Sequence, residues 1–255
     1  MFIRTITLGV ADPHPLSPEA IRRAAATLQL ASARYTEAGY EVQTVRLSTR
    51  PIFDDLADWS PAALVDYAQE LQRMLDDAGI GFCSLGPAQA ARPDFPLERI
   101  ELIADLLGPA GALNATVQLA TAEDGLRAQA ALPAARVMRR LAYETAEGFG
   151  NFRFAILACV GPGSPFFPSA YHAGPASLSL GLQGAGVVAG ALEAYKNSGP
   201  IDLDRIAELV RAALIEQASP VVTLGQELAS EYGLAFGGID LSPAPMGDDS
   251  IVTAL

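Results

Sequence analysis

Short apolar runs that suit β-strands alternate with stretches of helical periodicity along the chain, and this alternation constrains the fold more than any other feature. The pattern predicts strands at residues 3–10, 41–47, 80–85, 113–119, 152–160, 178–182 and 234–241. Regular alternation is typical of a mostly parallel sheet covered by helices, either closed as a barrel or open and doubly wound. No G-x-G-x-x-G motif follows the first strand, which disfavours dinucleotide binding. The predicted fold class is therefore α/β.

Ser-Pro pairs mark three of the predicted helix starts, because a serine hydroxyl caps free backbone N–H groups and proline suits the first helical position. These pairs are Ser17-Pro18, Ser60-Pro61 and Ser219-Pro220. The first two helices are expected to end at Gly39 and Gly79, since glycine tolerates the left-handed conformation of a helix end. Further helices are predicted at 97–107, 133–147, 186–197, 203–217 and 220–232.

Composition excludes several classes of partner. A chain of 255 residues with 50% hydrophobic and 18% charged residues can bury a substantial core as a single domain over 1–255. Its 17 Lys+Arg and 29 Asp+Glu give a net charge of −12, which would repel a phosphate backbone, so nucleic acid is not expected as a partner. No charged residue occurs from 154 to 192, but prolines interrupt this stretch too often for a membrane-spanning helix. We therefore expect a globular protein without a membrane partner.

The two cysteines, Cys83 and Cys159, lie in apolar strand-like runs. This placement suits small buried side chains in a reducing compartment, and the first residues lack the pattern of a signal peptide. We therefore expect a cytoplasmic protein. At the other end, residues 251–255 begin an amphipathic helix of about one turn, which is too short to be stable. The chain is accordingly expected to be the N-terminal part of a longer protein.

Candidate ligand-binding residues follow the predicted strands, because ligands of α/β sheets bind at the carboxyl ends of the strands. Asp12 and His14 follow the first strand, and Ser48, Thr49 and Arg50 follow the second. Hydroxyl groups beside a guanidinium could form an anion cradle. The alternative is a plain turn, since Arg50 precedes a proline and Ser and Thr favour turns. No Cys or His spacing suits a zinc site, so no metal is predicted.

Two segments rich in proline and glycine are the strongest candidates for a site. In 160–172, these residues fix the chain path, and the apolar pair Phe166 and Phe167 favours burial. Such a loop could present Tyr171 and His172 to a ligand, or it could be a structural plug in which His172 is a hydrogen-bonded residue. In 237–245, Asp240 and Ser242 share one face by period-two alternation. Asp240 could be a general base, a metal ligand or the partner of an arginine, or it could be a cap or turn residue.

These segments also carry a family resemblance. The motifs GNFRF at 150–154, PGSPFFPSAYH at 162–172 and GIDLSPAP at 238–245 resemble a widespread family of uncharacterised prokaryotic proteins, as do RTITLG at 4–9 and TVRLST at 44–49. That family is grouped by fold with the pyruvate formate-lyase-like barrels. The resemblance implies a large α/β barrel of about ten strands, incomplete in this chain, and a homo-oligomer. It implies no settled function, and neither a glycyl-radical loop nor adjacent catalytic cysteines occur in the sequence.

The function predicted from these features is an enzyme that acts on a small polar or anionic metabolite in a barrel cavity, without glycyl-radical chemistry. The predicted catalytic residues are His172 and Asp240, as acid and base. The predicted substrate-binding residues are Arg46 or Arg50 for an anion, Tyr171 or Asn114 as hydrogen-bond donors, and Ser48, Thr49 and Ser242. The sequence indicates no particular cofactor. The alternative is a non-catalytic metabolite-binding or regulatory protein, or a structural oligomer with Phe166 and Phe167 at the interface.

Overall fold

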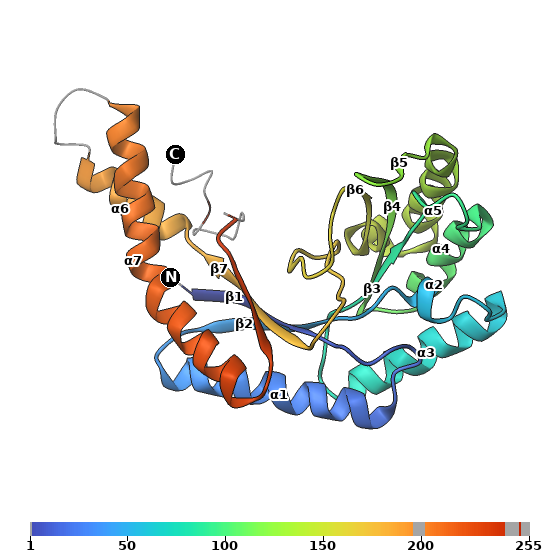
Figure 1. Ribbon diagram of the computed structural model, residues 1–255, viewed down its shortest axis with the longest axis horizontal. Helices are drawn as coiled ribbons and strands as arrows, with labels where there is room; N and C mark the ends of the chain where they lie inside the picture. The colour runs from blue at the N-terminus through green and yellow to red at the C-terminus, as the bar shows by residue number, and fades with distance from the viewer. Residues whose placement is uncertain (1, 196–201, 243–249, 251–255) are drawn as a thin grey trace. The chain divides into compact units, whose positions relative to one another are not determined.

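Strands and helices alternate along the chain in the computed structural model, which describes residues 2–195, 202–242 and 250 (Figure 1). The strands are β1 (Phe2–Gly9), β2 (Val42–Ser48), β3 (Cys83–Ala88), β4 (Leu113–Thr121), β5 (Gly125–Leu126), β6 (Phe154–Ala158), β7 (Ser177–Gln183) and β8 (Ala235–Asp240). The α-helices are α1 (Pro18–Glu37), α2 (Ile52–Asp55), α3 (Pro61–Asp77), α4 (Leu102–Leu107), α5 (Ala131–Glu144), α6 (Ala185–Tyr195) and α7 (Leu203–Glu231). All seven predicted strands are confirmed. The short elements α2 and β5 were not predicted.

The strands of the described residues form one eight-stranded sheet in the order β5-β4-β3-β2-β1-β7-β8, with β6 also paired to β4. The pairs β2–β3, β3–β4 and β4–β6 are parallel, and the short β5 is antiparallel to β4. The predicted α/β class is therefore confirmed. The closed barrel implied by the resemblance is not confirmed, because this sheet is not closed.

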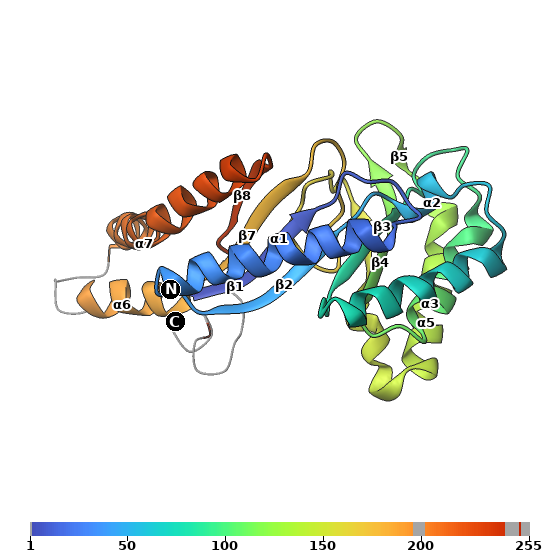
Figure 2. The ribbon, with the colours of Figure 1, turned by 90° about the horizontal axis from the view of Figure 1, so that it is seen from below.

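The chain divides into two compact units. Unit 1 comprises residues 1–6, 29–44 and 178–255, and unit 2 comprises residues 7–28 and 45–177. In unit 1, α7 lies beside β8 in both ribbon views (Figures 1 and 2), and the buried Tyr35 hydroxyl donates a hydrogen bond to the Val221 carbonyl over 2.9 Å. In unit 2, α3 and α5 lie on one side of β3 and β4 (Figure 2).

Alternation along the parallel strands gives the sheet of unit 2 two different faces. Leu47, Cys83 and Leu113 are paired across β2, β3 and β4, and their neighbours Ser48, Ser84 and Asn114 are paired in the same register. Successive residues of a strand point to opposite faces, so the first set faces one side and the second set the other. All six side chains are buried. One face is therefore an ordinary apolar core, whereas the opposite face carries a buried row of polar groups.

Helix starts were predicted correctly at two of the three Ser-Pro pairs. Ser60 caps α3 through its hydroxyl, which accepts a hydrogen bond from the Ala63 N–H, and α1 begins at Pro18. The third prediction was wrong, because α7 runs through Pro220 without a break. The Ser219 hydroxyl donates to the Ile215 carbonyl, as a residue inside a helix does, and buried neighbours on both sides of the proline hold the helix together.

Two expectations about burial also need correction. Cys83 is buried as predicted, but Cys159 is exposed just beyond the end of β6. The segment 160–172 is buried only at Ala170, Tyr171 and His172, and the rest of it is exposed or half-buried. The aromatic pair therefore does not fill the core.

Candidate functional site

Polar side chains from three neighbouring parallel strands of unit 2 lie in one row across the sheet. The buried row Ser48, Ser84 and Asn114 spans β2, β3 and β4. The Val10 N–H donates to the Ser48 carbonyl over 2.9 Å, which places Gly9, at the end of β1, beside Ser48. Gly9 and Ser48 are the last residues of β1 and β2, and open α/β sheets bind ligands at such carboxyl ends, whereas Ser84 and Asn114 are the second residues of β3 and β4. We call Gly9, Ser48, Ser84 and Asn114 the polar row.

The segment after β6 lies on the polar row and is fixed there by hydrogen bonds. The Ser84 hydroxyl donates to the Ala170 carbonyl, and the His172 N–H donates to the Thr49 carbonyl over 2.9 Å. The side-chain amide of Gln118 donates from Nε2 to the Val160 carbonyl over 2.7 Å. Both ends of the segment 160–172 are therefore attached to the strands that carry the polar row.

His172 has one ring nitrogen engaged and one without a partner. Its Nε2 lies 2.8 Å from the Pro175 carbonyl, which only accepts, so Nε2 carries the proton. Nδ1 is then an acceptor, and it has no hydrogen-bond partner among the described residues. The ring is 3% exposed and lies directly over Gly9, where a Cβ atom would stand 2.3 Å from Nδ1. An imidazole whose Nδ1 is not engaged by the described residues thus lies on the polar row.

Within unit 2, three further buried atoms on this side of the sheet lack a partner among the described residues. They are Thr7 Oγ1 on β1, and Thr116 Oγ1 and Gln118 Oε1 on β4. Thr7 shares a face with Gly9, and Thr116 and Gln118 share a face with Asn114, because each pair or triplet is spaced by two residues. The sequence analysis missed these residues. The polar residues at positions 114, 116 and 118 of an otherwise apolar strand were the signal that could have found them.

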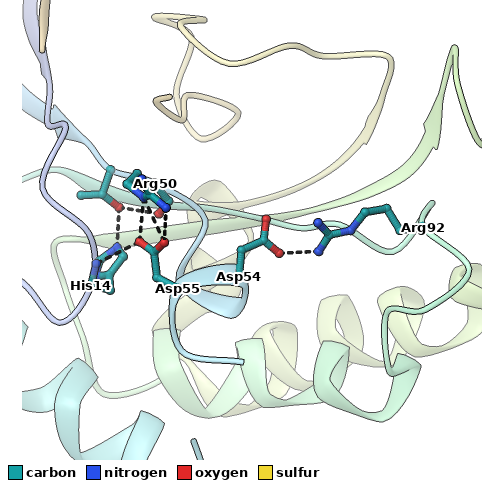
Figure 3. A network of polar contacts seen from close by, with 6 residues as sticks. His14, Arg50, Asp54, Asp55 and Arg92 are labelled. Atoms are coloured by element: carbon teal, nitrogen blue, oxygen red, sulfur yellow. Dashed lines mark hydrogen bonds and ion pairs between the residues drawn. The ribbon is translucent and has the colours of Figure 1, made fainter. Parts of the chain in front are cut away.

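His14 is the centre of a second polar cluster, formed by the loops after β1 and β2 (Figure 3). Its Nδ1 lies 2.7 Å from the Tyr67 hydroxyl, and its Nε2 lies 2.8 Å from the Thr49 hydroxyl. The Leu16 N–H donates to the Tyr67 oxygen, so the Tyr67 proton is free to go to Nδ1. The proton of His14 is then on Nε2 and goes to Thr49, whose own proton goes to the Ser84 carbonyl 2.8 Å away. In this series of hydrogen bonds, from Tyr67 through His14 and Thr49 to the Ser84 carbonyl, each side chain donates one proton to the next group.

Burial lowers the pKa of His14 to about 4, although the nearby Asp55 opposes the shift. Desolvation disfavours the charged imidazolium, and this loss outweighs the attraction of the carboxylate. His14 is therefore neutral at pH 7 and both of its nitrogens are occupied. It positions Thr49, whose carbonyl holds His172, rather than offering a free atom to a ligand.

Arg50, predicted to hold an anion, is already paired within this cluster. Its guanidinium donates two hydrogen bonds to Asp55 Oδ1, at 2.9 Å from Nε and 2.6 Å from Nη2, and Asp55 Oδ2 also accepts the backbone N–H of His14. Asp54 points instead toward Arg92 and forms an ion pair with it (Figure 3). Burial raises the pKa of Asp54, and the attraction of Arg92 works against that rise. The charges of this edge are therefore matched in pairs.

Arg46, the other predicted anion ligand, lies between two aromatic rings. Its guanidinium carbon is 4.8 Å from the centre of the Phe82 ring and 5.0 Å from that of Phe167. Such contacts are favourable because the ring faces carry negative charge density. The contact with Phe167 also attaches the segment 160–172 to β2.

The predicted hydrogen-bond donors Tyr171 and Asn114 both donate to the main chain. The Tyr171 hydroxyl donates to the Val160 carbonyl over 2.9 Å, and burial raises its pKa. Asn114 Nδ2 donates to the Ala112 carbonyl over 3.0 Å. These two residues therefore lie where the prediction placed them, near Ser48, Thr49 and His172, but with their donors engaged.

Asp240 and Ser242 belong to unit 1, whereas His172 belongs to unit 2. The Asp240 carboxylate forms an ion pair with Arg4 over 2.7 Å and accepts the Ser242 N–H over 2.6 Å. Arg4 also donates to the Ser242 carbonyl over 3.1 Å. Of the roles considered for Asp240, the structure displays the arginine partner.

An open groove of about 590 Å³ lies beside the His14 cluster in unit 2. It is lined by Pro15, Leu16, Ser17, Trp59, Ala63, Asp66, Tyr67, Glu70 and Arg73. The Tyr67 side chain thus borders the groove with its ring and contacts His14 with its hydroxyl. Within the described residues, no three His, Cys, Asp or Glu side chains are grouped so as to hold a metal ion. None of the helices in the described part of the chain is long and apolar enough to span a membrane.

Comparison with known proteins shows which family the sequence of this chain matches. The family described as Uncharacterised ACR (DUF711) matches residues 1–255. A UPF0210 protein of Actinobacillus pleuropneumoniae is 26% identical over 274 residues, and one of Neisseria gonorrhoeae is 25% identical over 271, each across 99% of this chain. A UPF0210 protein of Oleidesulfovibrio alaskensis is 26% identical over 272 residues, across 98% of the chain. The chain spans 59% of the length of each relative, and their names state no reaction or ligand.

Proposed function

The chain belongs to the Uncharacterised ACR (DUF711) family, and from this premise we propose that it contributes the substrate-binding part of an enzyme that acts on a small polar metabolite. The ligand would lie on the polar row of unit 2, against the segment 160–172. Family membership bears out the resemblance to uncharacterised prokaryotic proteins. It names no function, so the proposal depends on the site itself.

The observation that carries the proposal is the set of unpartnered buried atoms beside the polar row. Thr7, Thr116, Gln118 and His172 each have a buried polar atom without a partner among the described residues. An unsatisfied buried polar group costs about 1–3 kcal/mol, so a fold rarely retains several on one face without use. A bound polar molecule would supply the missing partners and offset these costs.

We assign the role of general base to His172. Its proton is held on Nε2 by Pro175, so Nδ1 has a lone pair that can accept a proton from a bound molecule. The Thr49 carbonyl fixes the backbone of His172, and the His14 cluster fixes Thr49 in turn. Asp240 keeps its ion pair with Arg4 and has no part in this step.

The second candidate function is binding without turnover. It is favoured by the paired charges around the polar row, since the Asp55 and Asp54 carboxylates are held by Arg50 and Arg92 and are not free to complement His172. The two functions differ in what happens to the ligand, which is recovered unchanged only in the second.

Thermal denaturation in the presence of a metabolite panel tests the proposal. A ligand at 100 times its dissociation constant adds about 2.7 kcal/mol, which raises the melting temperature of a chain of this size by roughly 5 °C. The variant His172→Gln can still donate to the Pro175 carbonyl but lacks the Nδ1 acceptor. We expect it to bind the hit and to lose turnover by at least a hundredfold. Thr27→Val, on α1, is the matched control and should change neither.

We further propose that the open sheet is part of a pyruvate formate-lyase-like barrel and that the protein is a cytoplasmic homo-oligomer. The family resemblance supports the barrel, and Phe166, which is 45% exposed, supplies apolar surface for a subunit contact. Light scattering of the wild type and of Phe166→Ser tests the oligomer. An unchanged mass would contradict a contact through Phe166.

A further inference from the structure

We infer that the ligand of the polar row is an uncharged molecule rich in hydrogen-bond donors, such as a polyol or a carboxamide. The inference rests on the proposed function and adds the chemical class of the ligand. It follows from which atoms of the site are already used and which remain.

The donor nitrogens of the site each already donate to a main-chain carbonyl. Asn114 Nδ2 donates to Ala112, Gln118 Nε2 donates to Val160, and His172 Nε2 donates to Pro175. Each of these nitrogens therefore has a partner in the protein, although the two amide groups keep a second N–H that a ligand could also use. What remains is Gln118 Oε1 and His172 Nδ1, both buried acceptors without a partner in the described residues. A ligand must therefore bring donors to them.

The hydroxyl groups of the site are compatible with a ligand that donates hydrogen bonds. Thr7 Oγ1 and Thr116 Oγ1 also lack partners among the described residues, and a hydroxyl can either donate or accept. A ligand that carries several O–H or N–H groups can satisfy the acceptors and exchange hydrogen bonds with these hydroxyls at the same time. A ligand with only acceptors would leave Gln118 and His172 unsatisfied.

Charge complementarity disfavours both an anionic and a cationic ligand. An anion needs a cation, but Arg50 is held by Asp55 and Arg46 lies between the Phe82 and Phe167 rings. A buried ammonium group needs a carboxylate, but Asp54 and Asp55 are held by Arg92 and Arg50. Burying an unpaired charge costs far more than burying a hydrogen-bonded neutral group. The structure therefore points to a neutral ligand and away from the anionic metabolite that the sequence suggested.

Matched sets of neutral, anionic and cationic molecules test the inference. We would measure binding by ligand-observed NMR and titration calorimetry with polyols, pyranoses and carboxamides of three to six carbons. Each is paired with its carboxylate and its amine, as in glucose, glucuronate and glucosamine. We expect a neutral member to bind at least tenfold more tightly than both charged counterparts. A charged member that binds more tightly than its neutral counterpart overturns the inference, and so does a panel in which no neutral member binds.

Removal of one buried hydroxyl group tests where the ligand binds. Thr116→Val removes an unpartnered oxygen with little change of volume, so the variant is expected to fold and to bind the neutral hit about fivefold more weakly. Thr27→Val should bind it as the wild type does. Loss of a charged ligand in Thr116→Val would retain the site and overturn only the ligand class. Binding that is indifferent to Thr116→Val and Gln118→Met would overturn the site itself.

Discussion

The imidazole of His172 lies directly on Gly9, so that a Cβ atom at position 9 would stand 2.3 Å from Nδ1 and 2.7 Å from Cε1. The absence of a side chain at the end of β1 is therefore what admits the ring to the polar row. The Pro175 carbonyl holds the ring at Nε2 and the Thr49 carbonyl holds the backbone N–H, so a displaced ring would lose its hydrogen bond to Pro175.

Gly9→Ala should consequently destabilise the protein. The added methyl group must displace the His172 ring or shift β1, and overpacking of this kind costs about 1–3 kcal/mol. Urea unfolding measures the change in the free energy of unfolding. The control is Gly81→Ala, since a Cβ at Gly81 meets nothing within 4 Å, and its effect should stay within about 0.5 kcal/mol. Equal effects of the two substitutions would show that the ring does not occupy this position.

His14 makes stability depend on pH. Its pKa is about 4 in the folded protein and about 6.5 when unfolded, so between these values the unfolded state binds more protons. Its contribution to stability is fully present above pH 6.5 and is lost as the pH falls toward 4. The loss amounts to about 3 kcal/mol over that interval. Urea unfolding at several pH values from 4 to 7.5 measures it.

The variant His14→Gln isolates this effect from the titration of the carboxylates. Glutamine does not titrate, so the free energy of unfolding of the variant should fall less steeply below pH 6.5 than that of the wild type. The comparison concerns the slopes, and it remains valid if the variant is less stable at every pH. Parallel curves would mean that folding leaves the pKa of His14 unchanged, which would contradict the lowered value.

Phe167→Leu should loosen the segment 160–172. The substitution removes the ring that faces the Arg46 guanidinium and the edge contact with Phe82, which together stabilise by about 1 kcal/mol. Hydrogen exchange of the His172 N–H, which donates to Thr49, should become faster. Phe166→Leu is the neighbouring control, because Phe166 is exposed and has no ring contact in the described part of the chain. Similar exchange in both variants would refute the role of Arg46 in holding the segment.

The two cysteines should differ in reactivity. Burial raises the pKa of Cys83 to about 12, so it is neither accessible nor ionised at pH 8, whereas Cys159 is exposed. Iodoacetamide should add one group to the folded chain, at Cys159, and two after unfolding, as counted by mass spectrometry. Cys159→Ser should take up none when folded. Rapid modification of Cys83 in the folded protein would contradict its burial.

The fold was predictable because local patterns and tertiary structure agree over most of the chain. Apolar runs located every predicted strand. The 3.6-residue periodicity indicated the helices, and the Ser-Pro caps located the starts of α1 and α3. The Ser-Pro pattern gave a wrong prediction at Pro220, because buried residues on both sides of the proline stabilise a continuous helix. Whether a Ser-Pro pair starts a helix or lies within one depends on contacts that no local pattern reveals.

The candidate site was predictable only in part. Ser48, Asn114 and His172 were predicted as site residues because ligands bind at strand ends and stiff loops, and the structure brings these three residues together in unit 2. The pairing of Arg50 with Asp55 and the placement of Asp240 in unit 1 lay beyond the sequence. Such pairings depend on which side chains meet in space, and residue type alone does not decide them.

The shared register of β2, β3 and β4 means that the core and the site cannot vary independently. If β3 slipped by one residue against its neighbours, the Cys83 thiol would enter the polar row, and the Ser84 hydroxyl would be forced between Leu47 and Leu113. One error of strand pairing would thus disrupt the polar row and the apolar layer at the same time. A misregistered chain is penalised twice, and the residues of the polar row also help to select the correct alignment of the sheet.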